Sequence, residues 1–221
     1  MRRLTFEGGE DLPGSAGLRL LAIGAHADDI EIGCGGTIMR LAAEGRLRSV
    51  RWVVLSASGP RAEEARMAAE AVLHDVPERE VMLHELRDGY FPYEGASVKD
   101  VFESLKDGPP PDLILTHRRE DAHQDHRLVA ELTWNTFRDQ LILEYEIPKY
   151  DGDLGTPNAY VEIPEVIARR KVELLMRHFP SQLERHWFSE ATFWALLRLR
   201  GIECRSSTGL AEGHTARKIL L

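Results

Sequence analysis

Two short clusters of histidine and aspartate in this chain could do chemistry. The first is His26-Ala27-Asp28-Asp29, and the second runs from His117 to His126 and holds three of the nine histidines. Imidazole nitrogen and carboxylate oxygen are ligands of zinc and of similar divalent ions. A catalytic metal site uses three protein ligands, and hydrolysis also needs a general base and a group that stabilises the oxyanion. Together the clusters hold enough groups for a metal-dependent hydrolase.

The elements that must position these clusters alternate between strand and helix. Expected strands are residues 18–24, 50–55, 81–84 and 112–116; expected helices are 37–45, 61–73, 98–105, 124–137 and much of 165–199. Residues 140–163 are expected to be largely a loop. The alternation predicts a single α/β domain, Rossmann-like, with a mostly parallel sheet flanked by helices. Each cluster directly follows a strand, at the end where such sheets bind ligands.

Because of the residues in these two clusters, the chain resembles the PIG-L/LmbE-like family of metal-dependent N-deacetylases, which act on N-acetylglucosamine-type compounds. The family's Ala-His-Pro-Asp-Asp motif and following Gly-Cys-Gly-Gly-Thr segment are matched within Ala25–Thr37, and its His-Pro-Asp-His motif is matched by His123–His126. Weaker matches include Arg61 with Glu64, and Asp88-Gly89. The resemblance spans roughly residues 18 to 215.

The resemblance implies a metal site and a reaction. His26, Asp29 and His126 would hold zinc, with ferrous iron as the other metal that this ligand set suits. Asp28 would be the general base for a zinc-bound water that attacks an acetamide carbonyl. The implied substrate is a small N-acetylated amino sugar, which would lose acetate and leave an amine.

The resemblance also assigns the oxyanion and substrate contacts. His123 would stabilise the oxyanion as a protonated imidazole, and Asp125 would pair with His123 and keep it charged, since a neighbouring carboxylate favours the charged form. Arg61 would contact the substrate or the oxyanion.

This chain departs from the family pattern in three places. Ala27 and Gln124 stand where the family usually has proline, and His214 stands where an aromatic residue is common. Ala27 affects the turn that aims Asp28 and Asp29, and His214 points to a different local substrate pocket. None of the three removes a proposed ligand.

Several residues near the clusters allow more than one interpretation. Gly33–Gly36 resembles a phosphate-binding loop, but the dinucleotide fingerprint is incomplete, so we expect a tight turn that enters the helix near the metal or substrate. Cys34 is expected to be a small buried residue. His117 fits a fourth ligand or a substrate contact, but we expect it to be structural or to support the ligands. Arg118 and Arg119 fit either a solvated rim or a contact to an anionic substrate.

Two other functions compete with the deacetylase. His26, Asp28 and His126 also match the two-histidine, one-carboxylate triad of non-haem iron oxygenases. That triad usually occurs in an all-β double-stranded helix fold. A non-catalytic relative that binds a sugar or nucleotide is the third hypothesis, although every proposed catalytic residue is present.

Length and composition limit the class of protein. The chain has 221 residues and a formal charge of −8, which argues against nucleic acid as a partner. Its two cysteines are far apart, and no run of apolar residues is long enough to span a membrane. We therefore expect a cytoplasmic protein, and both a monomer and a homo-oligomer fit the sequence. The expected division is an N-terminal extension at 1–17 and a deacetylase domain at 18–221.

Overall fold

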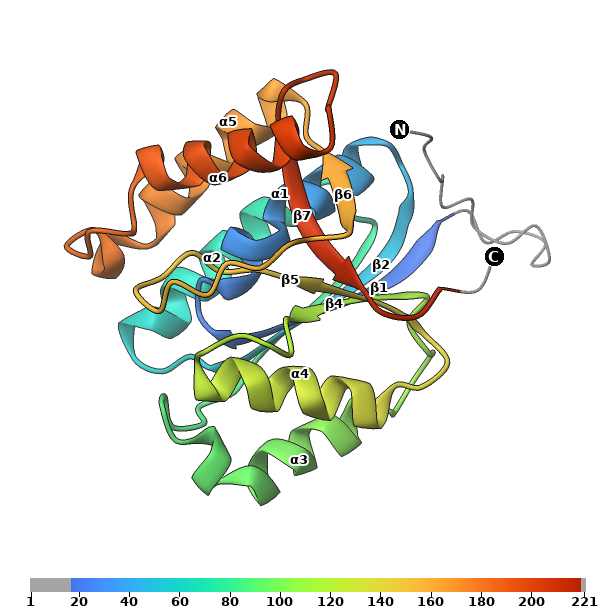
Figure 1. Ribbon diagram of the computed structural model, residues 1–221. Helices are drawn as coiled ribbons and strands as arrows, with labels where there is room; N and C mark the ends of the chain where they lie inside the picture. Colours follow the sequence, from blue (N-terminus) through green and yellow to red (C-terminus); the bar gives the residue numbers. More distant parts are fainter. Residues whose placement is uncertain (1–16, 220–221) are drawn as a thin grey trace.

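The computed structural model describes residues 17–219, and its centre is a seven-stranded β-sheet (Figure 1). The strands lie in the order β3-β2-β1-β4-β5-β7-β6. Their bounds are β1 Leu18–His26, β2 Leu47–Ser56, β3 Glu78–Leu83, β4 Leu113–His117, β5 Leu141–Tyr145, β6 Ala159–Glu162 and β7 Ala211–Ala216. Strands β1 to β5 pair in parallel, whereas β7 is antiparallel to both β5 and β6.

Helices cover both faces of this sheet. Helices α3 and α4 lie on one face, and α1, α2, α5 and α6 lie on the other (Figure 1). Their bounds are α1 Asp29–Ala43, α2 Pro60–Val72, α3 Gly95–Ser104, α4 Gln124–Thr136, α5 Glu165–His178 and α6 Glu190–Glu203, with short 3-10 turns at η1 Phe91–Tyr93 and η2 Pro180–Gln182. The prediction of a mostly parallel α/β sheet is confirmed. The all-β fold expected of an iron oxygenase is not the fold of the described residues.

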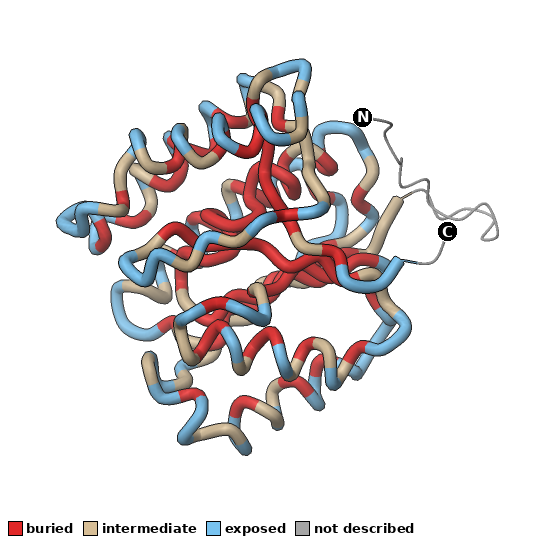
Figure 2. The backbone as a smooth tube through the Cα atoms, viewed as in Figure 1, coloured by how far each residue is buried: buried red, intermediate tan, exposed pale blue. Residues whose placement is uncertain are grey.

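The central strands are buried on both faces (Figure 2), as their continuous apolar runs predict. Leu21, Ala22 and Ile23 of β1 have no exposed surface. Side chains on one face pack with α1, α2 and α5, and those on the other pack with α3 and α4. The polar residues that follow β1 and β4 are therefore held at the carboxyl end of two well-packed central strands.

Helix α1 begins earlier than the sequence analysis predicts. It starts at Asp29 and continues through the glycines, instead of starting at residue 37 after a glycine turn. The glycines permit close packing of the helix against β5 and β7. A Cβ atom at Gly33 would lie 2.1 Å from the ring of Tyr145, and one at Gly36 would lie 2.7 Å from the carboxylate of Glu212. The predicted glycine turn is therefore wrong.

The last third of the chain also differs from the prediction. The region expected to be largely a loop contains β5 and β6, and β7 follows helix α6. Strand β7 lies between β5 and β6, so these three strands complete one side of the sheet. The true loop is shorter, between Tyr145 and Ala159.

Most of the predicted N-terminal extension, 1–16, lies outside the described residues, as do residues 220 and 221. Within residues 17–219, no helix combines the length and apolarity needed to cross a membrane.

Candidate metal centre

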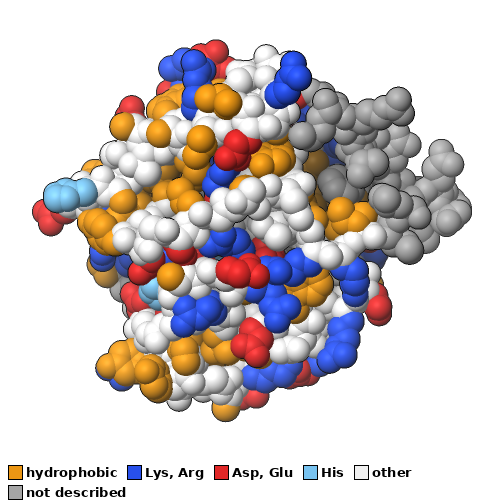
Figure 3. All heavy atoms as spheres, in the orientation of Figure 1, with side chains coloured by type: hydrophobic (Ala, Val, Ile, Leu, Met, Phe, Trp, Pro, Cys, Tyr) orange, Lys and Arg blue, Asp and Glu red, His pale blue; other side chains and the backbone are white. Residues whose placement is uncertain are grey.

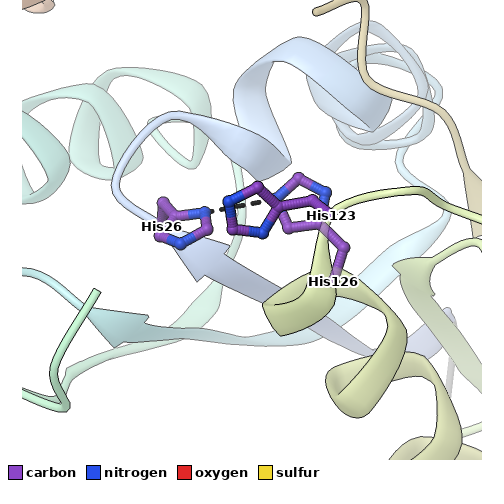
Figure 4. A group of neighbouring side chains, drawn as sticks. All are labelled: His26, His123 and His126. Carbon is purple, nitrogen blue, oxygen red and sulfur yellow. Dashed lines mark hydrogen bonds between the residues drawn. The ribbon is translucent and has the colours of Figure 1, made fainter. Parts of the chain in front are cut away.

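The two clusters meet at the carboxyl ends of β1 and β4. These neighbouring strands flank the point where the strand order reverses, which is where open α/β sheets bind ligands. His26 is the last residue of β1 and Asp29 is the first of α1. His123 caps the amino terminus of α4, and His126 lies in its first turn. The three imidazoles face one another between the β1–α1 loop and α4 (Figure 4).

Three of the predicted ligands form a small triangle. Nδ1 of His26 lies 3.2 Å from Nε2 of His126 and 3.4 Å from Oδ2 of Asp29. Nε2 of His126 lies 3.5 Å from the same Asp29 oxygen. Ligand atoms bound to one tetrahedral zinc ion at about 2.0–2.1 Å lie about 3.3 Å from one another. The spacing and the donor types therefore fit a single divalent ion.

Carboxylates surround the imidazole of His26. Besides Asp29 on Nδ1, Asp88 and Asp125 lie 3.1 Å and 3.3 Å from Nε2. Burial favours the neutral form, but these carboxylates outweigh it and raise the pKa of His26 well above its usual value. A site with this excess of negative charge attracts cations.

Asp29 is buried against three imidazoles. His117 lies 3.1 Å from Oδ2 of Asp29, and the same oxygen accepts a hydrogen bond from the backbone N–H of His26 at 2.7 Å. Burial would raise the pKa of Asp29, but His126, His117 and His26 lower it well below its usual value. Asp29 is therefore a carboxylate, the form that a metal ligand must take.

Buried Asp28 and partly exposed Arg61 form an ion pair next to these groups. Nη2 of Arg61 donates to Oδ1 of Asp28 at 2.8 Å, and Asp28 is only 5% exposed. Burial raises the pKa of Asp28, while the Arg61 charge opposes the rise. A raised pKa makes a carboxylate a stronger base toward a nearby water molecule. Arg61 thus contacts the predicted base.

The Asp125 carboxylate makes its hydrogen bonds elsewhere than at the His123 ring, so its expected pairing with His123 stays a prediction. The Asp125 oxygens accept from the backbone N–H groups of Gly89 at 2.7 Å and Phe91 at 3.1 Å, and one also faces His26. Residues two apart at the start of a helix point in different directions. The contact that does exist runs from the Asp125 backbone N–H to Nδ1 of His123, at 3.3 Å.

The expected protonation of His123 is a separate prediction, and the surroundings of the ring oppose the charged form. Burial and the neighbouring His26 lower the pKa of His123, and the charge of Asp125 only partly opposes them. Because Nδ1 accepts a hydrogen bond, the neutral ring carries its proton on Nε2. His123 is then a neutral hydrogen-bond donor, which can still stabilise an oxyanion.

The sequence analysis missed Asp121, gave Asp88 only as part of a weak motif match, and expected His117 to be structural or to support the ligands. Asp121 is buried, with Oδ2 placed 3.1 Å from Nδ1 of His126. Burial would raise the pKa of Asp121, but His126, His117 and Lys149 hold it well below the usual range. His117 ends β4 and stacks on the His126 ring, and Asp88 faces His26. The available signal was that Asp121 and His117 belong to the histidine-rich cluster and that Asp88 follows β3.

Other residues named from the sequence lie outside this arrangement. His214 is buried in β7 and contacts Thr37 at 3.1 Å, so it does not shape an open substrate pocket. Cys34 is buried, as predicted. Arg118 is mostly buried, and Arg119 lines a shallow groove with Arg138 and Lys218. Figure 3 shows basic side chains gathered over the region of α4.

Comparison with known proteins identifies the family. Residues 21–137 match the family model described as "PIG-L: GlcNAc-PI de-N-acetylase". The chain is also 31% identical over 174 residues to the uncharacterized deacetylase YaiS of Escherichia coli K12, which covers 72% of this chain and 89% of YaiS. The chain belongs to the PIG-L family of deacetylases, as the motifs predict.

Solved structures share the fold at lower identity. The N,N'-diacetylchitobiose deacetylase of Pyrococcus horikoshii is 18% identical with a TM-score of 0.64, over 90% of this chain and 83% of that one. The 4-carboxy-2-hydroxymuconate hydratase GalB of Pseudomonas putida KT2440 is 16% identical with a TM-score of 0.68, over 92% of this chain and 98% of that one. The fold therefore occurs in proteins with different activities.

Proposed function

We propose that this protein is a metal-dependent hydrolase that removes the acetyl group from an N-acetylated amino sugar. The metal is zinc or ferrous iron, held by Nδ1 of His26, Oδ2 of Asp29 and Nε2 of His126. The observation that carries the proposal is the triangle of these three atoms, with edges of 3.2, 3.4 and 3.5 Å. Membership of a deacetylase family supports the amide substrate. The chitobiose deacetylase supports a sugar as its carrier.

The remaining residues would divide the work of amide hydrolysis. When bound, the metal supplies Lewis acidity and lowers the pKa of water. Asp28 takes the proton from the attacking water, and Arg61 holds the Asp28 carboxylate in place. His123 donates a hydrogen bond from Nε2 to the oxyanion. Asp125 orients His26 and fixes Gly89 and Phe91 of the loop beside it.

The first test of this function is the metal content of the protein. Wild type and His126→Ala are purified in parallel without added metal, and zinc and iron are counted by mass spectrometry. We expect close to one metal ion per wild-type chain and a loss of metal in the variant. Acetate release from N-acetylglucosamine and N,N'-diacetylchitobiose is then measured for the metal-loaded protein.

The outcomes separate the competing functions. No metal in wild type, even after anaerobic loading with zinc or iron, would favour a non-catalytic binding protein. Bound metal together with hydration of an unsaturated acid, and no release of acetate from any acetamide, would favour a hydratase such as GalB over a deacetylase.

A further inference from the structure

We propose that Lys149 and Asp153, in the loop between β5 and β6, position the metal ligand His126 through Asp121. Metal affinity and the order of this loop would then depend on each other. The inference rests on the proposed metal centre. It adds Lys149 and Asp153, whose contacts are with Asp121 and its neighbours in the chain.

The contacts start at His126. Its Nε2 belongs to the proposed ligand triangle, while its Nδ1 lies 3.1 Å from Oδ2 of Asp121. A carboxylate beside the far nitrogen of a ligand histidine favours the tautomer with its proton on that nitrogen, which leaves the other nitrogen free to bind a metal. The other Asp121 oxygen accepts the backbone N–H of His123 at 2.8 Å. Asp121 is thus tied to the same turn that presents His126.

Lys149 continues the contacts outward. Its Nζ lies 3.1 Å from Oδ1 of Asp121, and 2.7 Å and 2.6 Å from the two oxygens of Asp153. The Lys149 side chain is 9% exposed and Asp121 is 2% exposed, so water offers little substitute for these contacts. Removing the ammonium would leave two largely buried carboxylates without their shared cation, which is strongly unfavourable. We therefore expect Asp121 to move when Lys149 is lost.

Asp153 connects the loop back to the segment that leads into α4. Its Oδ2 accepts the backbone N–H of Ala122 at 2.6 Å, and its carbonyl oxygen accepts from the Arg118 guanidinium. Arg118 packs so closely on Gly155 that a Cβ atom there would lie 1.6 Å from Nη1. The loop is therefore fastened on both sides of Asp121.

These contacts make the loop and the ligand thermodynamically linked. A metal that holds His126 in its ligand orientation also favours the Asp121–Lys149–Asp153 arrangement, and an ordered loop in turn favours metal binding. The linkage would connect residues 148–157 of this loop to the metal site.

The test compares zinc dissociation constants, measured by competition with a chelator. Lys149→Met should bind zinc about 10- to 100-fold more weakly than wild type, the usual effect of losing a group that supports a ligand. Asp121→Asn should weaken zinc binding similarly. The double variant should lose much less than the two losses combined, because both act along one path.

Lys171→Met is the matched control. Lys171 is a buried lysine whose Nζ lies 2.6 Å from Glu212 and touches no proposed ligand. Its loss should lower the stability of the protein and leave zinc affinity near that of wild type. A loss of affinity as large as in Lys149→Met would show that general destabilisation, rather than positioning, explains the effect, and would overturn the inference.

Amide hydrogen exchange supplies the second readout. Zinc should slow exchange in residues 148–157 of wild type, and much less in Lys149→Met. Equal zinc affinity in wild type and Lys149→Met would overturn the linkage alone. Failure of wild type to bind zinc would overturn the metal centre as well, so the two proposals fail in distinguishable ways.

Discussion

Asp28 and Asp29 are neighbours in sequence, yet their surroundings shift their pKa values in opposite directions. Asp29 is held by imidazoles that lower its pKa, whereas burial raises the pKa of Asp28. We expect Asp28→Asn to keep its metal and to lower kcat by at least about 100-fold, the usual scale for a lost general base. Acetate release and metal content, measured on the same preparation, check this.

Asp29→Asn is the natural comparison for that variant. It should lose the metal, because a neutral amide replaces the carboxylate of the ligand triangle. Near-wild-type turnover in Asp28→Asn would remove the residue from the role of base, and metal loss in both variants would leave the two aspartates without distinct roles.

The sequence predicts which residues meet, but it does not predict all of their contacts. The motifs predict that His26, Asp29 and His126 meet, and the residues do meet because both clusters follow adjacent parallel strands. The contact of Asp125 with His26 was not predictable, because it depends on where the first turn of α4 sits against β1. Asp121 was missed because its partner Lys149 is distant in sequence and lies in a loop without a periodic pattern.

At the scale of elements, helix α1 is fitted closely against β5. The Gly33 position leaves no room for a side chain, since a Cβ atom would lie 2.1 Å from Tyr145. The Tyr145 hydroxyl donates to the carbonyl of Ile23 at 2.7 Å and cannot move freely. Gly33→Ala should therefore lower the free energy of unfolding by about 1–3 kcal/mol, the usual cost of overpacking. Urea denaturation of the metal-free protein measures it.

Gly35 provides a control two residues away in the same helix. A Cβ atom there would meet only Glu31 and the helix backbone, at 3.9 Å. Because alanine favours helix more than glycine, Gly35→Ala should leave stability unchanged or raise it by up to about 1 kcal/mol. Equal destabilisation by both substitutions would mean that packing against Tyr145 is not the cause.

Elements were predictable where their burial follows a simple pattern. The apolar runs of β1, β2 and β4 identify buried parallel strands from composition alone. Strand β7 carries Glu212 and His214 at buried positions, so its sequence does not look like a strand. Those polar groups are acceptable inside only because Lys171 and Thr37 contact them, and such long-range partners are invisible in a local pattern.

At the scale of the molecule, the site lies at a place that the topology creates. The strand order reverses between β1 and β4, and α1 and α4 both begin at the carboxyl ends of these strands, where open α/β sheets bind ligands. A deacetylase and a hydratase share this fold, so the topology does not select the reaction. The ligand triangle and the flanking loops must therefore determine the chemistry.

Stability of the whole molecule should depend on pH through a second polar network, which lies between α1, α5 and β7. Glu212 accepts hydrogen bonds from the backbone N–H groups of Gly36 and Thr37 and from Lys171. His214 lies beside this network with its Nε2 3.1 Å from the Thr37 hydroxyl. Burial lowers the pKa of His214 to about 4, although the charge of Glu212 opposes the change. His214 is therefore neutral in the folded protein near neutral pH.

The lowered pKa of His214 determines whether stability rises or falls with pH. An unfolded histidine takes up its proton near pH 6.5, whereas folded His214 does so only near pH 4. Stability is therefore full above pH 6.5 and falls as the pH decreases toward 4, by up to about 3 kcal/mol from this residue. His214→Gln should remove that part of the slope. Urea denaturation with chelator present, at pH 8 and pH 4.5, compares the two proteins; a difference in stability that stays constant between these pH values would show that His214 does not contribute.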